Sequence, residues 1–163
     1  MIFKEKKHSV NLYNTLLYLS RNIFFYRDLQ LEDNYETRIY LMFFHYSIIL
    51  YIMKQRGNKP DQVNYNNLFF NIENNLRELG FGDVSVNKKM KDMNKIFYDI
   101  LIKFNDSSTD FKLNKNLITK YFVKLKDNDD KFNNFSRYFS NFYTFCFEIP
   151  SENMIHNTQK YKF

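Results

Sequence analysis

Six apolar residues near the middle of the chain follow one another at spacings of 4, 3, 4, 3 and 4 residues. They are Val86, Met90, Met93, Phe97, Ile100 and Phe104. A period of about 3.5 residues places all six on one face of an α-helix, whereas a half-buried strand would show strict alternation of apolar and polar residues. The opposite face carries charged side chains, namely Lys88, Lys91, Asp92, Lys95 and Asp99. The pattern predicts an amphipathic helix from about residue 86 to residue 104.

Helical periodicity of the same kind extends over most of the chain. Further helices are expected at residues 10–20 with Ser9 as N-cap, and at 35–56, 63–79, 114–125 and 132–147. Alternating strand patterns never last beyond a few residues, and helix breakers are rare, with 3 Gly and 2 Pro among 163 residues. The sequence therefore predicts an all-α fold, a single compact multi-helix domain of about six helices. We expect this domain to occupy residues 1–150 and a polar C-terminal tail to occupy residues 151–163.

The most apolar segment runs from Ile39 to Met53 and is interrupted only by His45 and Ser47. As a helix these 15 residues span about 22 Å, at 1.5 Å per residue. A helix that crosses a bilayer requires roughly 20 residues. We therefore expect a central helix that neighbouring helices cover on all sides. The first residues, Met1 to Lys7, are charged and no apolar signal segment follows, so an intracellular location is expected.

Residues for catalysis or metal binding do not cluster in this sequence. The three histidines, His8, His45 and His156, lack metal-ligand spacing, and no glycine-rich phosphate or dinucleotide motif occurs. The single cysteine, Cys146, lies among aromatic residues and is expected to be a small buried side chain. His45 is expected to be a core histidine bonded to a carbonyl or a hydroxyl group. We expect a protein that is not an enzyme, with no catalytic residue, metal or cofactor.

The stretch from Leu76 to Lys91 is the most informative part of the chain. Gly80 occupies the position after a helix end, where a positive φ is common, and Asp83 or Ser85 is placed to cap the next helix. One interpretation is a hinge between two helices with solvated lysines. The other is a helix N-terminus that favours anions, because its free N–H groups lie beside Lys88, Lys89 and Lys91.

This stretch resembles the signature of the ubiquinol–cytochrome c chaperone family. The matching residues are Leu76, Arg77, Glu78, Leu79, Gly80, Phe81, Gly82, Asp83, Val86, Lys88, Met90 and Lys91, with Leu79 where Met is usual. Phe25-Tyr26, Asp33, Arg38 and His45 are similar in order and rough spacing to further family positions. The candidates for partner or client binding are therefore Arg77, Glu78, Gly80, Gly82, Asp83, Lys88, Lys91, Lys95, Tyr26, Arg38 and His45.

The resemblance implies an all-helical, non-enzymatic assembly factor for the cytochrome bc1 complex, respiratory complex III. Its expected partners are newly made cytochrome b or other subunits of that complex, with a small partner chaperone and the ribosome as further partners, and no DNA. The implied location is the cytoplasmic face of the bacterial inner membrane, with the mitochondrial matrix as the alternative. Aromatic and Met side chains could line an apolar groove for the client, and Lys88, Lys91 and Lys95 could make electrostatic contacts.

Two other functional classes are open to a sequence of this kind. The net charge of +6 suits a basic helical module that binds RNA or the ribosome. A helical enzyme acting on an isoprenoid or quinone-like lipid would need paired carboxylates on a helix. The dense acidic run Asp127–Asp130 is predicted to lie in a turn and lacks Asp-x-x-x-Asp spacing, which argues against that class.

Overall fold

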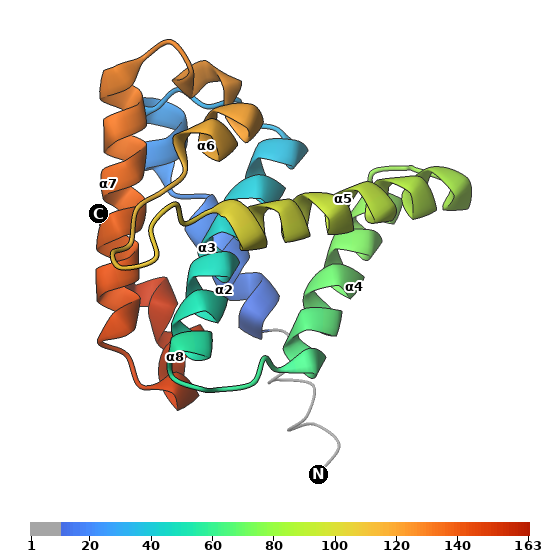
Figure 1. Ribbon diagram of the computed structural model, residues 1–163. Helices are drawn as coiled ribbons and strands as arrows, with labels where there is room; N and C mark the ends of the chain where they lie inside the picture. The colour runs from blue at the N-terminus through green and yellow to red at the C-terminus, as the bar shows by residue number, and fades with distance from the viewer. Residues whose placement is uncertain (1–10) are drawn as a thin grey trace.

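The central helix of the computed structural model, which describes residues 11–163, is the apolar segment. This helix, α3, spans Tyr35–Gln55, and every side chain from Leu41 to Ile49 is buried. The helices α2, α5 and α7 pack around it (Figure 1). The prediction of a core helix covered on all sides is therefore confirmed. Among the described residues, no helix combines the length and the apolarity that crossing a bilayer requires.

The all-α fold is also confirmed, and most boundaries lie within a few residues of their predicted positions. In chain order the elements are α2 (Asn11–Ser20), the π-helical turn η1 (Phe24–Asp28), α3, α4 (Gln62–Glu78), α5 (Asp83–Lys103), α6 (Lys115–Tyr121), η2 (Val123–Leu125), α7 (Asp129–Phe147), η3 (Ser151–Asn153), α8 (Met154–Asn157) and η4 (Thr158–Lys160). Residues 11–163 contain no β-strand, only an isolated bridge between Asn105 and Leu113. The expected N-cap Ser9 lies outside the described residues.

Side-chain caps define where most of these helices begin. Asn34, Asp61, Asn114 and Asn128 each precede a helix and accept hydrogen bonds from backbone N–H groups of its first turn. Such caps satisfy donors that have no partner within the helix. At the other end of α3, Gly57 adopts a φ of 73°, the left-handed conformation that commonly follows a helix C-terminus.

An aromatic cluster lies in the core between η1, α3 and α7. Phe25, Phe44 and Phe139 are fully buried, as is Cys146, for which burial raises the pKa of the thiol. His45 lies within this cluster: its Nδ1 donates to the Leu41 carbonyl at 2.6 Å, so its Nε2 accepts the Tyr138 hydroxyl at 2.9 Å. The prediction of a core histidine is confirmed, and burial lowers the pKa of His45 to about 3.

The C-terminal residues differ from the polar tail that the sequence predicts. Residues 151–163 form short helical turns that pack on α2, and Met154 and Tyr161 join the core. The Tyr161 hydroxyl donates to the Tyr138 carbonyl at 2.9 Å. The buried side chains are separated by polar residues in a segment too short for a clear helical period. The helical domain therefore continues to the end of the described residues.

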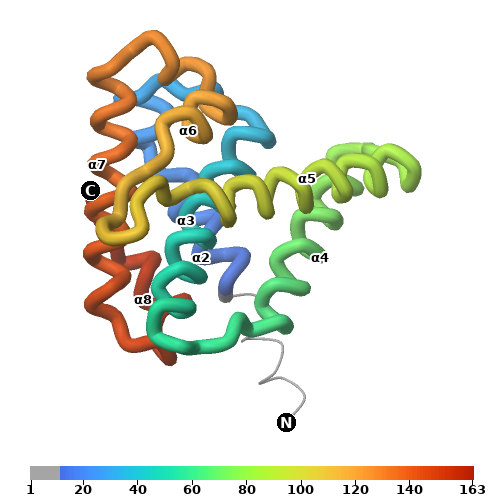
Figure 2. The backbone as a smooth tube through the Cα atoms, viewed as in Figure 1, coloured from blue at the N-terminus to red at the C-terminus, as the bar shows by residue number. Residues whose placement is uncertain are grey.

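Helices α4 and α5 leave this body and meet at a corner that projects away from it (Figure 2). Helix α4 packs on α2, and α5 packs on α3. The turn between Glu78 and Asp83 lies at the tip of the projection (Figure 1). The segment that carries the family-like signature is therefore the part of the described chain that reaches furthest from the core.

Candidate partner-binding surface on α4 and α5

A glycine with positive φ ends α4 at the corner. Gly80 has a φ of 96°, as the sequence predicts, and its N–H donates to the Arg77 carbonyl at 3.0 Å. The Phe81 N–H donates to the Leu76 carbonyl at 3.3 Å. These two bonds close the last turn of α4 and satisfy carbonyls that the helix itself leaves without partners. Gly80 is thus a structural residue that sets the chain direction.

The start of α5 differs from the prediction that Asp83 or Ser85 caps it. The N-cap is Gly82, in extended conformation and without a side-chain cap, and Asp83 is already the first helical residue. The Asp83 carboxylate pairs with Arg77, whose guanidinium also reaches Glu73 at 3.3 Å. Asp83 binds the preceding helix because its side chain points back across the turn. Arg77 thereby links the end of α4 to the start of α5.

The corner presents apolar side chains to solvent. Leu79, Phe81 and Val84 are 60%, 38% and 85% exposed, although Leu76 and Val86 beside them are buried. The Lys89 ammonium lies 4.6 Å from the centroid of the Phe81 ring. We call Leu79, Phe81 and Val84 the apolar corner. The backbone there is held by hydrogen bonds and an ion pair, so the exposed side chains are presented from a defined turn.

The lysines of α5 lie on its exposed face, as predicted. The buried stripe is confirmed at Val86, Met93, Phe97, Ile100 and Phe104, with Met90 partly buried. Lys88, Lys91 and Lys95 are exposed and, within the described residues, form no ion pair. We call these three residues the lysine face. They lie on one line along the helix, together with the exposed residues Val84 and Tyr98.

Asp99 does not belong to the solvated face where the sequence pattern places it. Its carboxylate contacts Lys103 at 2.7 Å and Lys120 at 2.8 Å, and it accepts the Tyr121 hydroxyl at 2.5 Å. These hydrogen bonds hold the pKa of Asp99 well below its usual range. Asp99 therefore ties α5 to α6 and leaves the lysine face without a carboxylate at that end.

The remaining candidates lie away from the corner. The Tyr26 hydroxyl donates to the Ser20 carbonyl at 2.7 Å, and burial raises the pKa of Tyr26 to about 12. Arg38 pairs with Asp33 at 2.5 Å, and His45 is enclosed in the core. The structure thus separates Tyr26 and His45 from the signature residues. Arg38 comes nearer, because it shares a surface pocket of about 440 Å³ with Glu78 and Leu79.

An apolar groove that the sequence analysis did not identify lies at the other end of α5. It has a volume of about 820 Å³ and forms between the C-terminal ends of α3 and α5 and the loop that follows α5. Its apolar lining is Leu50, Tyr51, Pro60, Leu101, Ile102 and Phe104. Ile102 is 74% exposed. In the sequence, only Leu101 and Ile102 indicate this groove, because they are apolar but lie off the buried stripe of α5. We call this the α3–α5 groove.

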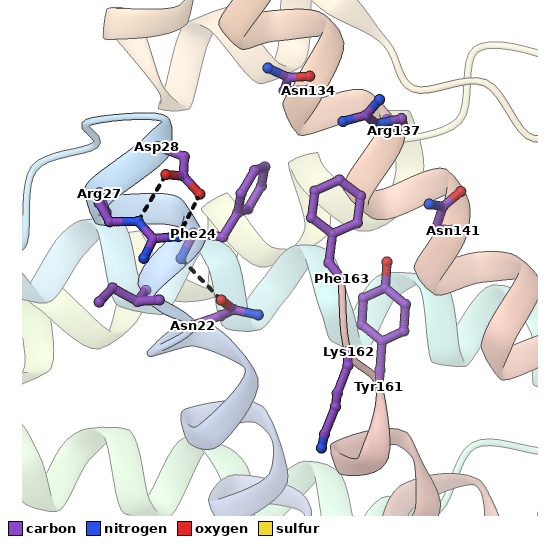
Figure 3. Close-up of a pocket in the computed structure, with 11 residues that line it drawn as sticks. Asn22, Phe24, Arg27, Asp28, Asn134, Arg137, Asn141, Tyr161, Lys162 and Phe163 are labelled. Carbon is purple, nitrogen blue, oxygen red and sulfur yellow. Dashed lines mark hydrogen bonds and ion pairs between the residues drawn. The ribbon is translucent and has the colours of Figure 1, made fainter.

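A third recess, between η1 and α7, has both polar and apolar walls. Figure 3 shows Asn134, Arg137 and Asn141 facing Phe163 and Tyr161 across it. Its volume is about 730 Å³, and the Phe163 ring packs 4.7 Å from that of Phe24. Among the described residues no three His, Cys, Asp or Glu side chains gather in a way that could hold a metal ion. The lining of this recess is mixed, because the exposed apolar side chains of Ile23 and Phe163 lie among the polar ones.

A comparison with models of protein families agrees with the all-helical fold and with the signature at the corner. The model described as Ubiquinol-cytochrome C chaperone matches residues 27–156, which include α3, the corner and the whole of α5. No curated protein sequence and no solved structure matches the chain. Because the family match spans most of the chain, the chain belongs to the ubiquinol–cytochrome c chaperone family.

Proposed function

We propose that this protein assists assembly of the cytochrome bc1 complex by holding newly made cytochrome b until further subunits join. Membership of the family supports a chaperone role in assembly of that complex. The observation that carries the finer proposal is an apolar groove at one end of a helix whose exposed face is basic. A binding role of this kind needs no catalytic group, so we propose a non-enzymatic protein.

The α3–α5 groove is the surface that we assign to the client. Its wall is built from aliphatic and aromatic side chains, and the Tyr51 and Phe104 rings pack edge to face at 5.5 Å. Lys54, Asn58 and Asn105 form part of its polar rim. Grooves with an apolar floor and a polar rim suit an apolar helix with polar ends. Cytochrome b is a membrane subunit, so its segments have that character before they insert.

The lysine face would add an electrostatic contact on the same helix, α5, toward the corner. Because Lys88, Lys91 and Lys95 project from one line of α5, an acidic partner or an anionic surface could meet all three at once. We propose that the protein works at the cytoplasmic face of the bacterial inner membrane, or in the matrix if its origin is mitochondrial. A small partner chaperone and the ribosome are further proposed partners.

A crosslinked pull-down of tagged protein from native membranes, with mass spectrometry of the bound proteins, tests the proposal. Wild-type protein should enrich cytochrome b or other subunits of the bc1 complex. The Ile102→Asp variant should lose most of that enrichment, because a carboxylate in the groove would be desolvated by an apolar client. Ile102 is exposed, so the fold should tolerate the change.

The control is Val123→Asp, which changes a side chain of similar exposure on η2, outside the groove. It should bind the client as the wild type does. Equal enrichment of the client by both variants would show that the groove is not the client-binding site. Recovery of ribosomal proteins and RNA alone, with a steep salt dependence, would instead favour the RNA-binding alternative.

A further inference from the structure

The apolar corner combines exposed apolar side chains, a fixed backbone and neighbouring basic residues. Leu79 and Phe81 lie on the turn that the Arg77–Asp83 ion pair braces, and Val84 follows in the first turn of α5. The described residues leave all three partly or largely exposed. We propose that this corner inserts into the headgroup region of an anionic bilayer. The inference deepens the proposed membrane location, because it names the surface that makes contact with lipid.

The shape of the corner favours a bilayer over a protein partner. It is the projecting corner where α4 ends and α5 begins, a narrow tip of the backbone (Figure 2). A stable protein interface commonly uses about 20–30 residues on each side with complementary shape. Three side chains on a narrow tip cannot supply such a surface. A fluid bilayer needs no matching surface, and apolar groups on a narrow tip can enter it while their backbone stays in the headgroup layer.

The charges around the corner fit an anionic lipid surface. Between residues 77 and 95 the basic residues are Arg77, Lys88, Lys89, Lys91 and Lys95, and the acidic ones are Glu78, Asp83 and Asp92. Asp83 is compensated by its ion pair with Arg77. Lys89 packs over the Phe81 ring, so an ammonium group accompanies an apolar side chain. Lysine stems can lie along apolar surface while their ammonium groups reach lipid phosphates.

A second copy of this chain is a poorer occupant of the corner. If two corners met face to face, the lysines at the start of each α5 would approach one another, and basic side chains there outnumber the acidic ones. That repulsion disfavours self-association through this surface.

The corner and the α3–α5 groove are separated along α5. Val84 and Ile102 are 18 residues apart on α5, which corresponds to about 27 Å along the helix axis. With the corner in the headgroup layer, the α3–α5 groove would lie at the far end of α5. A client segment leaving the bilayer could then be held without detaching the protein from lipid.

Vesicle co-sedimentation of the full chain tests the inference directly. Vesicles of phosphatidylcholine alone are compared with vesicles that also contain phosphatidylglycerol. Wild-type protein should bind the anionic vesicles about 100-fold more tightly, the contribution expected of three lysines near an anionic surface. The variant Leu79→Ser/Phe81→Ser/Val84→Ser should lose about tenfold or more in affinity for the anionic vesicles.

The matched control changes three exposed apolar residues elsewhere, Ile23→Ser/Val63→Ser/Val123→Ser. It should bind as the wild type does, with circular dichroism establishing that both triple variants fold. Equal loss in the two variants, or no loss in the corner variant, would overturn the inference. So would equal binding of wild type to both vesicle types.

The same variants separate this inference from the proposed function. If the corner variant leaves the vesicles but still enriches cytochrome b in the pull-down, both proposals stand as written. If it keeps vesicle binding and loses cytochrome b, the corner is a protein contact and the lipid inference is wrong. If wild type binds anionic vesicles but never enriches a bc1 subunit, the lipid inference stands and the client assignment fails.

Discussion

The aromatic core and the apolar corner both hold large apolar side chains, but only one of them is covered. Phe25, Phe135 and Phe139 in the core are fully buried, whereas Phe81 and Leu79 at the corner face solvent. The core side chains contribute to folding because neighbouring helices remove them from water. The corner obtains its order from backbone hydrogen bonds and an ion pair. Its side chains therefore remain available for contact with another molecule.

The largest difference should appear when a phenylalanine is truncated in each region. Phe139→Ala should lower the free energy of unfolding by about 3–5 kcal/mol, because it removes buried area and leaves a cavity. Phe81→Ala should change it by less than about 0.5 kcal/mol, as is usual for an exposed residue. Chemical denaturation of both variants measures the contrast. Similar losses would mean that the corner belongs to the core.

Acidification should reveal the buried histidine of the core. The pKa of His45 in the folded protein is about 3, below the ordinary value of about 6.5 that the unfolded chain should show. As the pH falls below about 6.5, the unfolded chain takes up a proton that the folded chain cannot. Stability is therefore complete above that pH and falls by up to about 1.4 kcal/mol per pH unit below it.

The slope can be assigned to His45 by substitution. In His45→Gln the dependence of the unfolding free energy on pH between 7 and 5 should flatten, whatever the overall stability of the variant. His156→Gln is the control, since His156 is exposed. It should keep the wild-type slope. A His45→Gln variant with an unchanged slope would show that His45 is not buried in the neutral form.

Substitutions at two glycines should show that the corner requires a positive φ at one of them and not at the other. Gly80→Val should destabilise the protein by about 1–2 kcal/mol, because a β-branched residue is strained at positive φ. Gly82→Ser should be neutral or stabilise by a few tenths of a kcal/mol, because Ser in an extended N-cap position can accept a bond from the first turn of α5. Thermal unfolding of the two variants compares them. Equal melting temperatures would refute the φ assignment of Gly80.

The smallest effect on stability is expected on the lysine face. Lys88→Glu/Lys91→Glu should leave helicity and melting temperature nearly unchanged, within about 0.5 kcal/mol, because both residues are exposed. The same variant should weaken attachment to partners or membranes. Circular dichroism that showed lost helicity would instead assign these residues to the fold.

Much of the fold could be predicted from apolar spacing alone. The stripe on α5 and the apolar run of α3 have clear helical patterns, so their burial followed directly. The C-terminal segment could not be predicted, because Met154 and Tyr161 are buried in short turns among polar residues. Their burial depends on α7, which precedes the segment, and on α2, which is distant in sequence. The spacing of apolar residues within the segment carries no information about such contacts.

The candidate surface was predicted only in part. Gly80 and the lysine face follow from local rules for helix ends and helix faces. The bond from Arg77 to Asp83 could not be predicted, because a carboxylate beside a helix start can equally cap that helix. The α3–α5 groove depends on how three segments come together, so Leu101 and Ile102 gave only a weak indication of it.

If this chaperone is needed for assembly of the cytochrome bc1 complex, cells that lack the protein should contain less of the complex. The most direct measurement is the amount of assembled complex, by native gel electrophoresis and cytochrome b absorbance, in cells that lack the protein. Complementation with wild-type or Val123→Asp protein should restore the complex, and Ile102→Asp should not. Normal levels of complex without the protein, or full restoration by Ile102→Asp, would contradict this account.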